Sequence, residues 1–213
     1  MNNFTFPEQA VIYVMDAYCG WCWGFSKRMA EFEAANRHRI AFTVISGGLF
    51  LDDRAVPLSS YPYIPQANER IASLTGAEFG TGYKTLLDKG EAVMDSLAAA
   101  EGLAVLRSLS PERAVHWAHE LQAAFYGQGL SLSDPATITG IAKAHGFDDA
   151  AVLSALQDGS AMAQARQDFA IARQLGVTSY PTLLYINDGV LHPLPATGTP
   201  LDVLNQTLDA LMG

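Results

Sequence analysis

The stretch Asp16-Ala17-Tyr18-Cys19-Gly20-Trp21-Cys22-Trp23-Gly24-Phe25 contains both cysteines of this 213-residue chain. In a reducing compartment, two thiols separated by two residues are typical of metal or redox sites. A structural zinc site usually needs four ligands, and the sequence has no second cysteine pair. We therefore expect Cys19 and Cys22 to form a redox pair and to bind no metal.

The segments on either side of the cysteines predict a βαβ unit. Val11–Met15 is a short apolar run rich in β-formers, as in a buried strand. Apolar residues recur at helical spacing over 25–32, so Cys22 should lie in a helix and Cys19 at its N-terminus. A second strand over 40–45 completes the unit, and a right-handed crossover makes the two strands parallel.

This position gives the two thiols different chemical roles. Unpaired N–H groups and the helix dipole stabilise a sulfur anion at the N-terminus of a helix. We therefore expect Cys19 to be the nucleophile. Cys22, one turn along and more buried, should attack the mixed disulfide that Cys19 forms and release its partner.

The remainder of the chain divides into a helical part and a short βα end. From about residue 65 to about 175 the pattern is helical and rich in alanine. Ser110-Pro111 and Asp134-Pro135 predict helix starts, with Ser or Asp as the cap and Pro in the first turn. The pattern over 182–194 predicts a hairpin, and a final helix is expected over 200–212.

Three stretches together resemble the DsbA family of thioredoxin-like proteins, and in particular its FrnE-like branch. The first is the cysteine segment, including the Trp-Gly-Phe that follows the second cysteine. The others are Ala124–Gly129, with Ser133-Asp134 and Ala144–Asp148, and the stretch from Ala172 to Thr182, which ends in Ser179-Tyr180-Pro181-Thr182.

The resemblance implies an α/β protein with a thioredoxin-like fold. An all-helical domain is inserted between its N-terminal βαβ unit and its C-terminal ββα unit. On this reading residues 1–60 and 160–213 form the thioredoxin-like domain, and residues 61–159 form the helical insert.

The resemblance also implies a cis peptide bond between Tyr180 and Pro181, facing the cysteines. Cis bonds are uncommon even before proline, so where one occurs it usually has a task. Here the task would be to present the Tyr180 backbone to an extended substrate beside Cys19, which makes Pro181 part of the catalytic set. The alternative is that Pro181 merely starts an edge strand.

Two positions depart from the family pattern. Many thioredoxin-like proteins carry a buried acid six residues before the first cysteine, where this chain has Tyr13. Asp16 is a candidate proton relay in its place, or it simply ends the strand. The residue before the proline is commonly Val or Thr, and the bulky Tyr180 should narrow the site and offer a stacking face.

Other residues around the motif are assigned by their position. Trp21 lies between the cysteines and should stay accessible, whereas Phe25 follows the buried helical spacing and should be core. His116 and His119, with Glu120, are expected to form an exposed helix face rather than a site. The substrate-binding candidates are Gly20, Trp21, Trp23 and Tyr180.

Composition and charge exclude several classes of partner. The formal net charge is −9, which disfavours nucleic-acid and anionic membrane partners. No stretch approaches the roughly 18 apolar residues of a spanning helix. The first eight residues have no basic segment before an apolar core, as a secretory signal would, so we expect a cytoplasmic protein.

Together these features predict a cytoplasmic thiol–disulfide oxidoreductase of the reductase or isomerase type. It would bind no cofactor beyond its own Cys19–Cys22 disulfide, with glutathione as a candidate co-substrate. Its partners would be a disulfide-containing protein or small thiol substrate and a cellular thiol reductant.

Two alternatives remain. Relatives such as 2-hydroxychromene-2-carboxylate isomerase and the kappa-class glutathione transferases share the inserted fold but replace the cysteine pair with a serine. A glutathione-dependent isomerase of small aromatic or polyketide molecules is therefore possible here, although both cysteines are kept. The other alternative is a chaperone-like module whose aromatic groove holds unfolded peptide.

Overall fold

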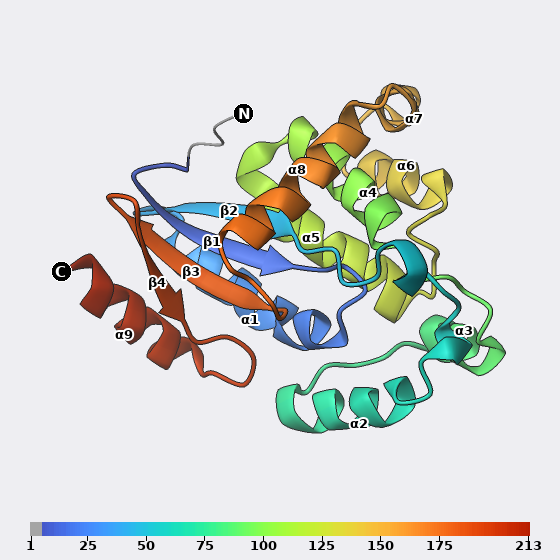
Figure 1. Cartoon of the computed structure of the whole chain (residues 1–213), viewed down its shortest axis with the longest axis horizontal. Coiled ribbons are helices and arrows are strands. Elements are labelled where there is room, and N and C mark those ends of the chain that lie inside the picture. The colour runs from blue at the N-terminus through green and yellow to red at the C-terminus, as the bar shows by residue number, and fades with distance from the viewer. Residues whose placement is uncertain (1–5) are drawn as a thin grey trace.

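The computed structural model describes residues 6–213 and contains one four-stranded sheet within that range. Residues 1–5, on which the expectation of no secretory signal partly depends, lie outside the described residues. The strand order is β2-β1-β3-β4 (Figure 1). β1 pairs in parallel with β2 and antiparallel with β3, and β3 pairs antiparallel with β4. The four strands are β1 (Gln9–Met15), β2 (Ala41–Ser46), β3 (Thr182–Asn187) and β4 (Val190–Leu194).

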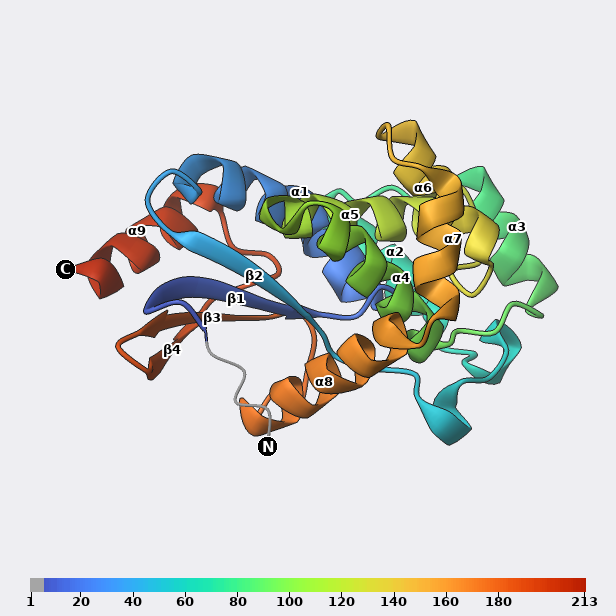
Figure 2. The same ribbon diagram turned by 90° about the horizontal axis from the view of Figure 1, so that it is seen from above.

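Helices cover both faces of this sheet. Helices α1 (Gly20–Asn36) and α9 (Leu201–Met212) lie on one face, and α8 (Ser160–Gln174) crosses the other (Figure 2). Tyr13 of β1 packs in the core on the α1 side, whereas its neighbour Ile12 packs with Ile171 and Ala172 of α8. Successive strand residues point to opposite faces, so a strand covered on both sides is apolar throughout. This explains the continuous apolar run of β1.

The segment between β2 and α8 is helical and lies beside one end of the sheet (Figure 2). It confirms the α/β fold class with a helical insertion between βαβ and ββα units. The 61–159 boundaries of the insert remain a prediction. Its helices are α2 (Ile64–Thr75), α3 (Thr81–Lys89), α4 (Ser96–Leu109), α5 (Ala114–Gln122), α6 (Pro135–Ala144) and α7 (Asp149–Gln157), with a π-turn over Ala123–Gly127 after α5.

One of the two predicted helix caps is wrong. Asp134 caps α6 as expected, and its Oδ1 accepts a hydrogen bond from the Ala136 N–H at 2.9 Å. Ser110 precedes a 3₁₀ turn that begins at Pro111 as expected and leads into α5, but its side chain makes no capping hydrogen bond; its Oγ instead accepts a hydrogen bond from Trp117 Nε1 at 3.0 Å. The Ser110 hydroxyl thus binds the buried indole N–H of Trp117 rather than a backbone N–H at the start of a helix.

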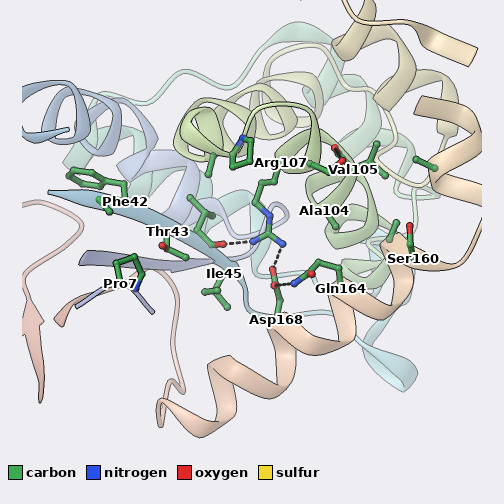
Figure 3. Close-up of a pocket in the computed structure, with 17 residues that line it drawn as sticks. Pro7, Phe42, Thr43, Ile45, Ala104, Val105, Arg107, Ser160, Gln164 and Asp168 are labelled. Atoms are coloured by element: carbon green, nitrogen blue, oxygen red, sulfur yellow. Dashed lines mark hydrogen bonds and ion pairs between the residues drawn. The ribbon is translucent and has the colours of Figure 1, made fainter. Parts of the chain in front are cut away.

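A buried ion pair joins the insert to the sheet. The Arg107 Nη2 of α4 lies 2.8 Å from the Asp168 Oδ2 of α8, and that same oxygen accepts a hydrogen bond from the Ser46 N–H at 2.9 Å. Arg107 also donates to the Val44 carbonyl of β2 (Figure 3). Gln164 donates to the other Asp168 oxygen at 3.2 Å. Backbone groups at the end of β2 are thus bound by side chains from α4 and α8.

Among residues 6–213, no helix is both long enough and apolar enough to cross a lipid bilayer.

Candidate active site

Cys19 is the N-cap residue of α1 and has extended backbone geometry, with φ −82° and ψ 112°. Only 5% of the residue is exposed. Its Sγ lies 3.5 Å from the Tyr180 carbonyl oxygen, to which the thiol donates a hydrogen bond. Cys19 therefore lies at the start of α1, as the sequence predicted, and beside the loop before β3.

The Tyr180–Pro181 peptide bond is cis, as the family resemblance implied. The tyrosine ring packs against Gly47, and its hydroxyl donates a hydrogen bond to the Gly47 carbonyl. A Cβ at position 47 would lie only 2.0 Å from Tyr180 Cε1, so the ring occupies the space of a missing side chain. Toward Cys19, Tyr180 presents its backbone carbonyl.

Cys22 lies in the first turn of α1 and is completely buried. Burial raises the pKa of its thiol well above the ordinary value, and the neighbouring Cys19 thiol raises it further. The backbone N–H of Asp16 acts in the opposite direction. The two cysteines are not bonded to each other in this structure.

Asp16 is buried directly after β1, with 3% of the residue exposed. Its Oδ1 accepts from the Tyr18 N–H at 2.9 Å and its Oδ2 from the Leu49 N–H at 2.7 Å. Burial raises the pKa of this carboxyl group, although the backbone N–H groups partly offset the rise. Asp16 therefore fixes the loop after β2 through the Leu49 N–H. Its charge also raises the pKa of the nearby Cys22 thiol.

Tyr13 occupies the position at which the family resemblance would imply a buried acid. Its hydroxyl lies beside the Cys22 thiol and the Gln122 side chain, both of which are fully buried. Burial, followed by the charges of Cys22 and Cys19, raises the pKa of Tyr13 well above the ordinary value. The group beside the Cys22 thiol is therefore a neutral phenol, and Asp16 is the nearby carboxyl group.

An aromatic cavity of about 120 Å³ opens beside Cys19. Gly20 and Trp21 line it, and Arg70 of α2 lies over the Trp21 ring at 5.9 Å. The insert supplies most of the opposite wall. The wall residues from the insert are Tyr63, Ile64, Ala67, Asn68, Ile71, Tyr83, Met94 and Tyr126.

Trp23 lies outside this cavity and connects α1 to the insert. Its ring stacks between His119 and Tyr126, with centroid distances of 5.7 and 5.9 Å. Its Nε1 donates to the Glu78 carbonyl at 3.1 Å. Of the predicted substrate-binding residues, Gly20, Trp21 and the Tyr180 backbone therefore meet at Cys19, whereas Trp23 packs against residues of the helical segment. Phe25 is core, with 1% exposed.

Three residues at the site were missed from the sequence. Gly47 accommodates the Tyr180 ring, and the Leu49 N–H binds Asp16. Tyr126 donates a hydrogen bond to the Tyr18 carbonyl at 2.6 Å, just before Cys19. Gly47-Gly48 ends the βαβ unit and Tyr126 lies in an insert motif, but neither signal links these residues to the thiols.

The larger cavity, about 570 Å³, lies away from the cysteines (Figure 3). Strand β2 and helices α4 and α8 enclose it, and Arg107 and Asp168 meet within it. No thiol lines it. Of these two cavities, only the smaller, aromatic one contains a thiol in its lining.

Solved structures with the same fold include two of the cytosolic disulfide reductase DsbM from Pseudomonas aeruginosa. One shares 23% sequence identity with this chain at a TM-score of 0.81, covering 95% of this chain and 98% of that one. The other, described as being with GSH, shares 22% identity at a TM-score of 0.79, covering 96% and 100%. A 2-hydroxychromene-2-carboxylate isomerase shares 13% identity at a TM-score of 0.64, covering 95% and 96%.

No curated protein matches the sequence. The family described as the DSBA-like thioredoxin domain matches residues 10–209, almost the whole chain. The thiol pair at a helix N-terminus and the cis-proline loop beside it agree with this match. The chain belongs to the DSBA-like thioredoxin domain family and is an enzyme of the protein-disulfide oxidoreductase and isomerase class.

Proposed function

We propose that this enzyme is a cytoplasmic disulfide reductase or isomerase in which Cys19 is the nucleophile and Cys22 the resolving thiol. The observation that carries the proposal is the position of Cys19 at the N-cap of α1, with its Sγ 3.5 Å from the Tyr180 carbonyl before the cis proline. A helix N-terminus stabilises a thiolate. The adjacent backbone of residue 180 offers an edge along which an extended substrate can pair.

Reduction proceeds in two exchanges. The Cys19 thiolate attacks one sulfur of the substrate disulfide, forms a mixed disulfide and expels the other substrate sulfur as a thiolate. Cys22 then loses its proton and attacks the Cys19 sulfur, which closes the Cys19–Cys22 disulfide and expels the second substrate thiolate. The substrate gains two electrons and two protons, and the enzyme pair loses them.

Asp16 is the acceptor that we propose for the Cys22 proton. Burial keeps the Cys22 thiol protonated because it raises the pKa, so resolution requires a base. The raised pKa of Asp16 makes its carboxylate a better base than an exposed one. Tyr13, a neutral phenol with a raised pKa, can orient the thiol but cannot accept its proton.

The oxidised enzyme must then be reduced by a cellular thiol, and we propose glutathione or a glutathione-linked thiol. The cavity beside Cys19, of about 120 Å³ and lined by aromatic and aliphatic side chains, can hold a small thiol or one short part of a peptide, but not the surface of a folded protein. The likeness to a disulfide reductase structure described as being with GSH supports this choice. Gly20, Trp21, Pro181 and the Tyr180 backbone would contact the substrate.

The test is a trapping experiment. Cys22→Ser leaves the attacking thiol but removes the resolving one, so mixed disulfides should accumulate on Cys19 when the variant meets oxidised glutathione or insulin. Mass spectrometry of the intact protein measures the adduct. Cys19→Ser is the matched control and should stay free of adduct, because the remaining thiol is fully buried. An unmodified Cys22→Ser protein alongside an unmodified control would refute the exchange mechanism.

A glutathione-dependent isomerase of small aromatic molecules is the second candidate. The aromatic lining of the cavity and the likeness to a 2-hydroxychromene-2-carboxylate isomerase favour it. Tight glutathione binding without any insulin reduction would support this candidate over the reductase.

A further inference from the structure

A cluster of metal-ligating side chains lies in the helical insert, apart from the thiols. His116 and Glu120 project from one face of α5, and His145 follows the last residue of α6. His119, which is nearer to His116 in the sequence, turns toward Trp23. The fold instead brings His145, 29 residues away, against His116.

The distances within this cluster match those between ligands of one tetrahedral ion. The Nε2 atoms of His116 and His145 are 3.3 Å apart, and Glu120 oxygens lie 3.9 and 3.5 Å from them. Zinc binds imidazole nitrogen at about 2.0–2.1 Å, which puts two tetrahedral ligands roughly 3.3 Å apart. We propose that His116, Glu120 and His145 form a Zn²⁺ site with a fourth position open to solvent.

The cluster is both supported and accessible. The Trp117 ring contacts both imidazoles, with centroid distances of 5.0 Å to each, and so fixes their planes. The exposed fraction is 34% for the His116 side chain, 31% for Glu120 and 24% for His145, so an ion can reach all three without local unfolding. Two imidazoles and a carboxylate are a ligand set used by zinc, and the fourth position is then commonly filled by water.

In the metal-free arrangement, Arg113 binds His145 in a way that competes with metal binding. Its Nη2 lies 3.2 Å from the His145 Nδ1, which must accept that hydrogen bond, so the proton of the neutral ring is on Nε2. Metal binding at Nε2 moves the proton to Nδ1, and Arg113 must turn away. The guanidinium also lies over the Trp117 ring at 4.5 Å, a contact it can keep as it turns. The site therefore has a built-in competitor.

The test uses the full, tag-free chain carrying Cys19→Ser and Cys22→Ser, because thiolates would otherwise bind the same metals. Titration with Co²⁺ should give the visible absorption of a tetrahedral ion at one equivalent, without thiolate charge-transfer bands, and Zn²⁺ should displace it. Zinc at about 100 times its Kd should raise Tm by roughly 5–10 °C. Absence of binding, or a cobalt spectrum without tetrahedral character, would overturn the proposal.

Variants of the ligands locate the site. His116→Gln and Glu120→Gln should each weaken zinc binding more than tenfold, whereas His38→Gln, on an exposed residue after α1, should bind like the parent. Equal binding by His116→Gln and the parent would overturn the assignment. Arg113→Gln removes the competitor and offers an amide oxygen to the His145 Nδ1–H, so zinc should bind up to about tenfold tighter. Unchanged affinity in that variant would refute the role of Arg113.

Discussion

Two buried aspartates bind opposite ends of the same short segment, residues 46–49, but only one of them is paired with a cation. Asp168 binds the Ser46 N–H and lies 2.8 Å from Arg107. Asp16 binds the Leu49 N–H at the other end of the segment and is held by backbone N–H groups and the Ser96 side chain, with no cationic partner. Burial raises the pKa of both, but the Arg107 charge opposes the rise only at Asp168.

The difference separates a structural role from a chemical one. The electrostatic field of Asp168 is largely cancelled by Arg107. Asp168 therefore serves to join α8 to β2. Asp16 keeps its negative charge close to the thiols, where it raises the pKa of Cys22. The same residue type thus fixes both ends of one segment, and in the mechanism that we propose only the end next to the cysteines takes part in proton transfer.

The largest effect is expected when the paired aspartate is removed. Asp168→Ala leaves Arg107 buried without its counter-ion and should lower the free energy of unfolding by about 3–5 kcal/mol. Urea denaturation measures it. In Arg107→Met/Asp168→Leu, much of the loss should return, because an apolar pair leaves no uncompensated charge. A single variant as stable as wild type would mean that the pair contributes little.

The second-largest effect is expected from a substitution in the segment that the two aspartates bind. Gly47→Ala puts a methyl group 2.0 Å from a Tyr180 ring atom and should destabilise the protein by about 1–3 kcal/mol. Insulin reduction should also fall, since Tyr180 presents its carbonyl to Cys19. Gly140→Ala, in open space on α6, is the control and should be neutral or stabilising. Tyr180→Ala should restore stability to Gly47→Ala, and a failure to do so would exclude the steric explanation.

The smallest effect is expected from a substitution of Asp16, the aspartate without a cationic partner. This substitution tests the proposed proton transfer. Asp16→Asn should slow release of substrate from the mixed disulfide about tenfold, equivalent to about 1.4 kcal/mol. Rapid-quench analysis of the Cys19 adduct measures this rate. Asp168→Asn, away from the thiols, should leave the rate unchanged. If Asp16→Asn resolves as fast as wild type, Asp16 has only a structural role.

The same variant has a defined pH signature. Burial raises the pKa of Asp16 in the folded state, so the unfolded chain releases this proton first as pH rises. The Asp16 contribution to the free energy of unfolding should therefore fall from the ordinary aspartate pKa up to the raised one. Asp16→Asn lacks this step, so the wild-type stability should decline relative to the variant across that interval. The opposite slope would contradict the buried, raised-pKa state.

Local patterns in the sequence were sufficient for most of the fold. Apolar runs predicted β1 and β2 to within about two residues, because a strand buried on both faces must be apolar. Helical spacing put Cys22 inside α1 and Cys19 at its start. The cis bond before Pro181 came from the family resemblance, since no local rule specifies it.

Contacts between distant segments could not be predicted in this way. Arg107 meets Asp168, and His116 meets His145, only after α4, α5, α6 and α8 have packed. The positions of these residues in the sequence give no sign of either contact. Ser110 was misread as a cap because the local Ser-Pro signal does not reveal the indole that takes its hydroxyl. The sequence thus predicted the thiols, but not the side chains from other elements that surround them.

The Arg107–Asp168 pair has one more consequence, for how molecules of this protein meet one another. Strand β2 is at the edge of the sheet, and its Gly47 end bonds inward to β1, so the Val44 carbonyl and the Ser46 N–H point outward. Arg107 and Asp168 bind these two groups, and at the opposite edge Pro193 of β4 has no N–H to offer. Both edges of the sheet are thereby made poor templates for a strand from a second molecule, so pairing between the sheets of two copies should be disfavoured.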